Sequence, residues 1–313
     1  MSKMSFDSKI LVTGSAGVLG RALVTLLKEK GFRKVFSPSS QECNLLSKNQ
    51  TEEYFLNVDP DFVFHLAGKV YGLGGNSKYK ADVIYENIMI NTNVIHASHL
   101  VNVNKIVAMG TVAMYPDPPV SNPALETDLW QGYPHKSEES YAVAKLAMLS
   151  MLEAYKESYQ LDYAFPLSTN LYGPGDRFND ETGHVIPSLI KKFYDAKQSD
   201  GSVTVWGTGK AERDFLFSAD AADGLICIME NLSGCVNLAS GNVVKIKDLV
   251  NTLIEITGVS NVRWDESKPD GQLIRSYNID KLSNCHFLSK HNLYEGLEKT
   301  WDWYVNNSDT VRT

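Results

Sequence analysis

The chain has 313 residues, of which 43% are hydrophobic and 21% charged, a balance typical of a folded globular protein rather than a disordered one. This length allows one large domain or two of moderate size with a substantial core. The net charge of −7 argues against nucleic acid or an anionic membrane surface as the main partner.

Apolar runs rich in β-branched and aromatic residues predict strands, and segments with helical spacing predict the helices between them. In chain order we expect a strand in 9–14, a helix over 17–32, strands from 34–39 and 61–68, a helix over 85–103, a strand in 105–110, a helix over 139–159 and a strand that begins in 161–173. Continuous apolar strands that alternate with helices indicate a parallel sheet covered on both faces. Right-handed crossovers then give an α/β, Rossmann-type doubly wound fold.

This alternation ends near residue 173, where a loop rich in Gly, Pro and Asp begins. Two short strands and a helix follow, and the last ~75 residues indicate a smaller mixed α/β part. We therefore expect a dinucleotide-binding domain in 1–173, to which 214–240 returns. The substrate lobe would comprise 174–213 and 241–313.

The four cysteines, Cys43, Cys227, Cys235 and Cys285, are widely spaced and form no CxxC pair and no Cys/His metal pattern. We expect buried thiols in a reducing cytosol. The N-terminal MSKMSFDSK is polar and too short for a signal peptide, and no apolar run approaches the ~18 residues that span a bilayer. The sequence therefore predicts a cytoplasmic protein with no membrane partner.

A glycine-rich turn, TGSAGVLGRAL, joins the first predicted strand to the first predicted helix. Gly14 permits a tight turn, Gly17 lets the backbone approach a pyrophosphate, and Gly20 allows close packing of helix on strand. The helix N-terminus adds N–H groups for the anion. The pattern predicts a dinucleotide site, with cofactor contacts from Gly14, Ala16, Gly17, Val18, Leu19 and Gly20 in the turn and from Leu66 and Ala67 after the third strand.

The segment after the second strand, FSPSSQECN, bears on which dinucleotide is bound. An acidic residue there would bind the ribose 2′-hydroxyl of NAD, and an arginine would hold the 2′-phosphate of NADP. Ser37 and Ser39 are the expected contacts, Glu42 comes late and is expected to start a turn, and the segment holds no cation. The sequence therefore favours NAD(H) slightly over NADP(H) and leaves both open.

Tyr141 and Lys145 in YAVAK stand one helical turn apart, on one face of the predicted helix over 139–159. A lysine ammonium near a phenol, together with a positive nicotinamide, favours the phenolate and makes the tyrosine usable as an acid or base. Thr111, at the end of the preceding strand, is placed to hold a substrate oxygen. By itself the spacing also fits an ordinary helix face with a packed tyrosine and an extended lysine.

Together these motifs resemble the extended short-chain dehydrogenase/reductase family, and the stretches STNLYGPGDRF, GHVIPSLIKKF and VTVWGTGKAERDFLF are similar to the GDP-L-fucose synthases within it. The likeness covers nearly the whole chain. It implies a 3,5-epimerase/4-reductase acting on a GDP-linked 4-keto-6-deoxymannose. It also implies a catalytic triad of Thr111, Tyr141 and Lys145, in which Tyr141 exchanges a proton with the C4 oxygen and Lys145 also binds the nicotinamide ribose.

The resemblance implies an epimerase pair as well, a cysteine and a histidine. The histidine is present as His184, followed by Val185, but Ala113 stands at the cysteine position in GTVAMYP. A methyl group cannot move a proton, so we expect C4 redox chemistry without efficient 3,5-epimerisation. His184 then serves as a substrate contact or as a structural loop residue.

The nucleotide end of the substrate is also assigned by resemblance. Arg213 and Arg275 match positions that grip the diphosphate, and two guanidiniums suit that anion. Asn170 and Trp206 fall on positions of the nucleotide lobe. Ala113, Val185 and Thr111 complete the expected substrate contacts.

We expect an NAD(P)-dependent oxidoreductase acting at C4 of a GDP-linked manno-type sugar, a 6-deoxyhexose or a heptose, for a surface polysaccharide. The alternatives are a full GDP-L-fucose synthase that uses another base and a catalytically idle nucleotide-sugar or NAD(P)-binding sensor. A 4,6-dehydratase is disfavoured, because Val112 and Ala113 stand where those enzymes carry Asp-Glu.

Family members pair through the helices that begin near 85 and 140, which implies a homo-oligomer. His96 and His99 lie on the first of these helices, but no further metal ligands are evident, so we expect packing or a subunit contact and no metal. The Gly-rich stretch 68–82 is expected to be either a cover over the sugar or a plain connection.

Overall fold

The structure is a computed structural model that describes residues 3–70, 79–179, 183–268, 270 and 272–311. Its elements are β1 Lys9–Thr13, α1 Val18–Glu29, β2 Lys34–Phe36, α2 Lys48–Val58, β3 Phe62–His65, α4 Lys80–Leu100, β4 Lys105–Ala108, β5 Gly110–Thr111, η1 Val112–Met114, η2 Glu126–Asp128, α5 Glu139–Tyr159, β6 Tyr163–Ser168, β7 Asn170–Tyr172, α6 Val185–Ser199, β8 Val203–Trp206, β9 Glu212–Phe217, α7 Ser218–Asn231, β10 Gly234–Leu238, β11 Val243–Lys245, α8 Ile246–Thr257, β12 Val262–Asp265, α9 Asp280–Ser283, α10 Leu293–Asn307 and η3 Ser308–Thr310.

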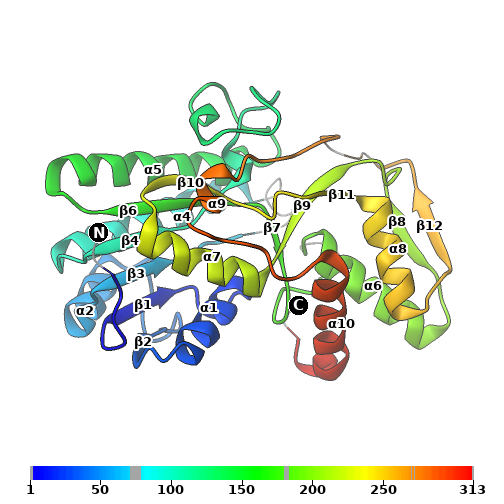
Figure 1. The fold of residues 1–313 in the computed structure, drawn as a ribbon, viewed down its shortest axis with the longest axis horizontal. Helices are drawn as coiled ribbons and strands as arrows, with labels where there is room; N and C mark the ends of the chain where they lie inside the picture. Colours follow the sequence, from blue (N-terminus) through cyan, green and yellow to red (C-terminus); the bar gives the residue numbers. More distant parts are fainter. Residues whose placement is uncertain (1–2, 71–78, 180–182, 269, 271, 312–313) are drawn as a thin grey trace.

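The main sheet has the strand order β10-β6-β4-β3-β1-β2, with β5 paired to the far end of β6 (Figure 1). Its described pairings are all parallel. The order reverses direction between β1 and β3, where a doubly wound sheet places its ligand crevice. The expected Rossmann-type fold is confirmed.

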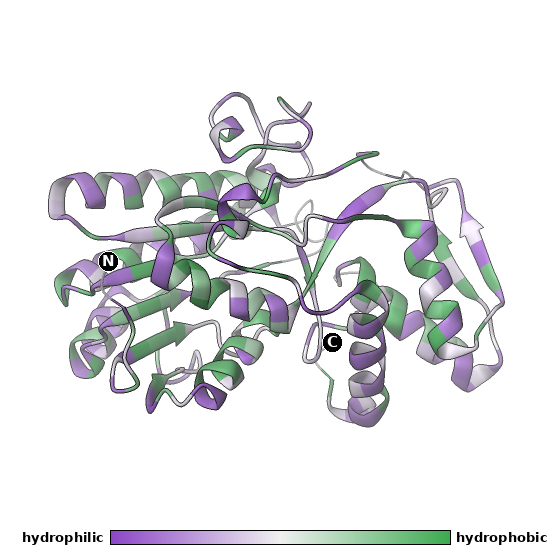
Figure 2. Cartoon of the chain, in the orientation of Figure 1, coloured by the Kyte–Doolittle hydropathy of each residue, from purple (hydrophilic) through white to green (hydrophobic). Residues whose placement is uncertain are grey.

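Helices cover both faces of this sheet. On one face α4 and α5 pack together with α2, and on the other α1 packs against α7. Hydrophobic residues concentrate in the strands, while the helices alternate hydrophobic and hydrophilic residues (Figure 2). This pattern is the one expected of a parallel sheet buried between two helical layers.

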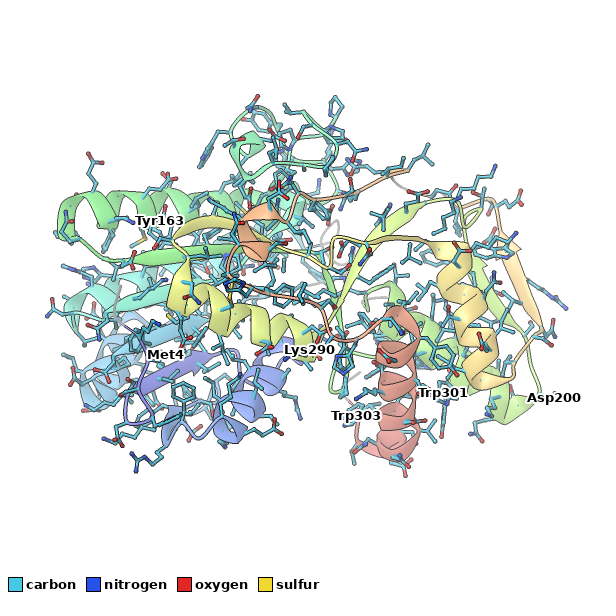
Figure 3. All side chains as sticks on the ribbon, viewed as in Figure 1. Met4, Tyr163, Asp200, Lys290, Trp301 and Trp303 are labelled. Atoms are coloured by element: carbon cyan, nitrogen blue, oxygen red, sulfur yellow. A yellow bond between two sulfur atoms is a disulfide. The ribbon has the colours of Figure 1, made fainter. Side chains whose placement is uncertain are left out.

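A second lobe stands beside the sheet and is built on the pair β8–β12 and the helices α6, α8 and α10. Its own core is rich in aromatic side chains and includes Trp301 of α10, which is 6% exposed (Figure 3). The three-stranded sheet β11-β9-β7 joins the two parts of the chain. The chain returns to the main sheet through α7 and β10.

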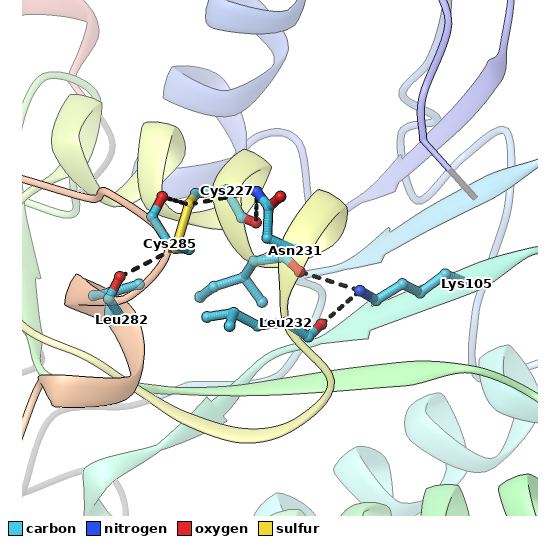
Figure 4. The surroundings of a disulfide bond; sticks show 7 residues. Lys105, Cys227, Asn231, Leu232, Leu282 and Cys285 are labelled. Atoms are coloured by element: carbon cyan, nitrogen blue, oxygen red, sulfur yellow. Dashed lines mark hydrogen bonds between the residues drawn. A yellow bond between two sulfur atoms is a disulfide. The ribbon is translucent and has the colours of Figure 1, made fainter. Parts of the chain in front are cut away.

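The expectation of free thiols throughout is wrong for one pair. Cys227 of α7 and Cys285, just after α9, form a disulfide with their Cα atoms 6.3 Å apart (Figure 4). Cys43 is buried and Cys235 half-buried, and both are free thiols. Sequence spacing did not reveal the pairing, because 58 residues separate the two cysteines and the fold alone brings them together.

Candidate active site

The glycine-rich turn lies at the carboxyl end of β1 and is packed tightly against the end of β3. Gly14 has φ of +73°, and a Cβ at this position would lie 2.6 Å from the backbone nitrogen of Ala67. A Cβ on Gly20 would lie 2.3 Å from the carbonyl oxygen of Gly14. Both positions therefore require glycine, and the turn delivers the start of α1 to the crevice.

The N-terminus of α1 has the features of an anion site. Gly17 is its N-cap and offers no side chain to the first backbone N–H groups of the helix. Ala16 is exposed and Val18 half-buried, while Leu19 is 6% exposed and belongs to the core. Leu19 can therefore serve a dinucleotide only through its backbone. These residues fit the pyrophosphate of a bound dinucleotide.

The segment after β2 turns back on itself. The hydroxyl of Ser15 donates to the carbonyl of Ser37 at 3.3 Å, which ties the segment to the glycine-rich turn. The carboxylate of Glu42 accepts from the backbone nitrogen of Ser39 at 2.8 Å. Glu42 is thus engaged within its own turn. The exposed Ser39 and the half-buried Ser37 remain as the side chains after β2 that could contact the ribose of a dinucleotide.

Leu66 and Ala67 follow β3 beside the same turn, and Ala67 donates its backbone N–H to the hydroxyl of Thr13 at 3.3 Å. That hydroxyl also contacts His65 Nδ1 at 2.8 Å, and His65 Nε2 contacts the amide oxygen of Asn91 at 3.1 Å. This buried chain fixes the ends of β1 and β3 against α4. It was not predicted from the sequence, where the three polar residues lie far apart.

Tyr141 and Lys145 lie on one face of α5. Lys145 is 2% exposed, and its Nζ is 5.7 Å from the centroid of the Tyr141 ring. Burial lowers the pKa of Lys145 to about 7. Burial also raises the pKa of Tyr141, and the carboxylate of Glu138 raises it further.

The expected activation of Tyr141 to a phenolate is therefore not present in the chain alone. In the low-dielectric surroundings of α5, loss of solvation outweighs the neighbouring ammonium. The phenol remains protonated at neutral pH, which suits a proton donor rather than a base.

Thr111 and Ala113 face α5 from the end of the sheet. Both lie where β5 turns into η1, and α5 packs on this segment. The Thr111 hydroxyl accepts from the backbone nitrogen of Ala113 at 3.2 Å, so this half-buried group caps η1. Ala113 is 6% exposed and lines a cavity together with Arg275 and Tyr277.

His184 is the N-cap of α6 and Val185 its first residue, and both keep part of their surface exposed. The protein atoms crowded around the imidazole lower the pKa of His184, while the carboxylate of Glu138 acts in the opposite direction and the guanidinium of Arg177 adds to the lowering. The ring is therefore neutral near pH 7 and can donate or accept a hydrogen bond.

Arg213 of β9 and Arg275 of the 272–279 segment form a cationic pair. Burial and the charge of Arg275 lower the pKa of Arg213. Asn170 begins β7 and donates its amide to the carbonyl of Asp214 at 3.0 Å, next to Arg213. Trp206 ends β8 and is 59% exposed. The ammonium groups of Lys192 and Lys268 lie 5.4 and 5.6 Å from the centroid of its ring.

Two further residues were missed in the sequence. Glu138, the residue before α5, places its Oε2 2.9 Å from Arg275 Nη2. Tyr277 is 6% exposed, and its hydroxyl has no hydrogen-bond partner among the described residues. Glu138 could have been found from the sequence, because it stands three residues before Tyr141. No sequence pattern distinguished Tyr277.

The model of the NAD dependent epimerase/dehydratase family matches residues 10–239. The chain belongs to this family. The predicted resemblance to the extended short-chain dehydrogenases/reductases is thereby confirmed. GDP-L-fucose synthase 1 of Arabidopsis thaliana is 36% identical over 312 residues, covering 98% of this chain and 96% of that protein.

Solved structures of the family are also similar. A GDP-mannoheptose C4 reductase from Campylobacter jejuni with NADP bound has a TM-score of 0.87 and 31% identity, over 96% of this chain and 99% of that one. A GDP-L-fucose synthetase from Naegleria fowleri bound to NADP has a TM-score of 0.92 and 28% identity, over 100% and 97% of the two chains.

Two searches of the described residues bear on other kinds of site. They contain no group of three or more His, Cys, Asp and Glu side chains able to hold a metal ion. They also contain no helix both long and apolar enough to cross a membrane. The Gly-rich stretch 68–82 was expected to be a cover over the sugar or a plain connection, and residues 71–78 of it lie outside the described part of the chain.

Proposed function

We propose that this chain is an NAD(P)-dependent oxidoreductase acting at C4 of a GDP-linked manno-type sugar, a 6-deoxyhexose or a heptose. The observation that carries the proposal is the packing of α5, which bears Tyr141 and Lys145, against β5, which ends at Thr111 on the same edge of the main sheet as the glycine-rich turn. The similarity to GDP-L-fucose synthases and to a GDP-mannoheptose C4 reductase supports the substrate class.

In this proposal a bound nicotinamide supplies hydride exchange with C4, and the chain supplies the proton. The protonated phenol of Tyr141 donates to the C4 oxygen as that oxygen gains charge, and the Thr111 hydroxyl hydrogen-bonds to the same oxygen. Lys145 binds the nicotinamide ribose. A phenol that stays protonated favours the direction of reduction, in which it acts as the acid.

We further propose that efficient 3,5-epimerisation is absent. Ala113 provides no acid or base beside the sugar. The retained His184 is one acid or base, and moving the protons at C3 and C5 needs a second group at the position that Ala113 occupies.

A full GDP-L-fucose synthase is the second candidate. It is favoured by the 36% identity to such an enzyme and by the retention of His184 at the start of α6. In the cofactor question, NADP is bound in the two related structures, whereas residues 37–44 of this chain carry no lysine or arginine. We propose a slight preference for NAD(H), which the ratio of kcat/KM for NADH and NADPH tests.

The division into a dinucleotide-binding domain, 1–173 with 214–240, and a substrate lobe, 174–213 with 241–313, is also proposed. The return of β10 to the main sheet beside β6 supports it. A homo-oligomer is proposed from the resemblance alone.

The test is NMR of GDP-4-keto-6-deoxymannose in D2O with the protein and NADPH or NADH. Reduction at C4 without deuterium at C3 or C5 is expected. Enzyme-dependent deuterium at both carbons would instead establish the fucose synthase. Tyr141→Phe should reduce turnover by about 10²–10⁴-fold, whereas Tyr159→Phe, at the far end of α5, should not. A catalytically idle sensor would instead show no turnover in the unaltered protein and would keep its ligand response in Tyr141→Phe.

A further inference from the structure

Glu138 links the start of the catalytic helix to the arginine proposed to bind the diphosphate. It is the N-cap residue of α5, three positions before Tyr141, and its Oε2 accepts from Arg275 Nη2 at 2.9 Å. The two side chains are only 17% and 22% exposed. Ion pairs shielded in this way are stronger than those on an open surface.

The guanidinium of Arg275 is held in this orientation from a second side. Its Nε donates to the side-chain oxygen of Gln272, and Gln272 donates to the carboxylate of Asp117. Asp117 in turn lies 3.8 Å from His135 Nε2. The pair with Glu138 is therefore part of a connected polar network and not an isolated contact.

The second guanidinium of this site, that of Arg213, is held differently from Arg275. Arg213 donates to two backbone carbonyls, those of Glu212 at 2.7 Å and Asp270 at 3.4 Å, and no ion pair of its guanidinium is present among the described residues. The two arginines stand on neighbouring backbones, since the Arg275 N–H donates to the carbonyl of Glu212 at 3.3 Å, and burial and the charge of Arg275 both lower the pKa of Arg213. Arg275 is therefore ion-paired while Arg213 is held by backbone carbonyls, and the buried hydroxyl of Tyr277 has no hydrogen-bond partner among the described residues.

We propose that Glu138 is a positioning residue that occupies Arg275 as an internal anion until the diphosphate of the substrate displaces it. The inference rests on the proposed GDP-sugar function. A diphosphate carries more charge than one carboxylate and can engage Arg213 and Arg275 together. Glu138 then loses its counter-ion next to Tyr141 and His184.

The exchange connects substrate binding to the proton donor. A carboxylate released from Arg275 raises the pKa values of His184 and Tyr141 more than a paired one, since the effects of Glu138 on both groups have this sign. The phenol is thereby kept protonated when the sugar is in place. The same competition weakens diphosphate binding, which assists product release.

The test is the affinity of the full chain for GDP, measured by calorimetry with the unaltered protein, Glu138→Gln and a second variant, Glu138→Ala. We expect both variants to bind GDP about fivefold to tenfold more tightly, the value of one partly buried ion pair. Glu139→Gln, the matched control in the same helical turn, should change affinity less than about twofold. In an Arg275→Gln background, Glu138→Gln should no longer tighten binding.

Turnover supplies a second readout. Glu138→Gln should lower KM and kcat together, since the substrate binds without the exchange that maintains the acid. Unchanged or weaker GDP binding in both Glu138 variants, with normal NADPH binding, would overturn the inference alone. Failure of every protein, including the unaltered one, to bind GDP while NADPH binds would reject the GDP-linked substrate, and the inference with it.

Discussion

Lys145 carries a prediction about stability that runs opposite to the usual effect of losing a buried side chain. Lys145 is 2% exposed, and no ion pair of its ammonium is present in the described part of the chain. Burial lowers its pKa from 10.5 to about 7. Lys145→Met should therefore stabilise the cofactor-free protein while it abolishes the proposed ribose contact.

The magnitude follows from proton linkage. The unfolded chain holds the Lys145 proton up to pH 10.5, but the folded chain holds it only to about pH 7. Between these values the unfolded state binds more protons, so the free energy of unfolding rises with pH. Compared with a side chain that is uncharged in both states, Lys145 with these folded and unfolded pKa values lowers the free energy of unfolding by about 4 kcal/mol at pH 7 and about 1 kcal/mol at pH 9.5.

These figures are upper limits, because water penetration and relaxation reduce the cost of a buried charge. We expect Lys145→Met to raise the free energy of unfolding by about 2 kcal/mol at pH 7 and by less than ~1 kcal/mol at pH 9.5. The measurement is urea unfolding of the cofactor-free protein at both pH values. Lys156→Met, on the same helix with a 48% exposed side chain, is the control and should change little. A destabilised Lys145→Met, or a gain that is equal at the two pH values, would refute the reasoning.

Three other measurements test the remaining features. Ala113→Cys should produce enzyme-dependent deuterium at C3 or C5 of the 4-keto sugar in D2O, at least about 10²-fold above the unaltered chain, and its absence would show that more than one group is missing. Lys105→Met should lower the free energy of unfolding in urea by about 3 kcal/mol, because Lys105 Nζ donates to the carbonyls of Ile228, Met229 and Leu232 at the end of α7 (Figure 4 shows the bond to Leu232). Thiol titration of the unfolded, unreduced chain should count two reactive groups, Cys43 and Cys235, and four after reduction; four before reduction would exclude the disulfide.

Most of the fold followed from the sequence because its signals are local. The helix expected over 139–159 has these same bounds as α5, and β1, β2, β3, β4 and β6 of the main sheet lie within the predicted runs, whereas β10 was not predicted as a separate strand. The helix α2 was not predicted, because only Thr51 and Phe55 of its residues are buried and its apolar periodicity is weak. Its start was nevertheless marked by Ser47, whose hydroxyl accepts from the backbone nitrogen of Gln50.

The candidate site was predictable only where chemistry and spacing coincide. Tyr141 and Lys145 are one turn apart, so a helix suffices to bring them together. The partners Glu138 and Arg275 are separated by 137 positions, and only the return of the 272–279 segment to the main sheet makes them neighbours. The raised pKa of Tyr141 in the chain alone was likewise not evident from the sequence, since burial is a property of the fold and not of the YAVAK spacing.

The two buried lysines differ in how well the surrounding chain satisfies their charges. Lys105 is 1% exposed, and burial lowers its pKa to about 8, yet its ammonium group donates hydrogen bonds to three carbonyl oxygens. Lys145 is equally buried but no such acceptor set surrounds it among the described residues. A cation left unsatisfied beside a protonated phenol is costly in the chain alone and becomes favourable once hydroxyl acceptors arrive. Cofactor binding should therefore stabilise the unaltered protein more than it stabilises the Lys145→Met variant. Such a result is expected of a site in which stability is given up for function.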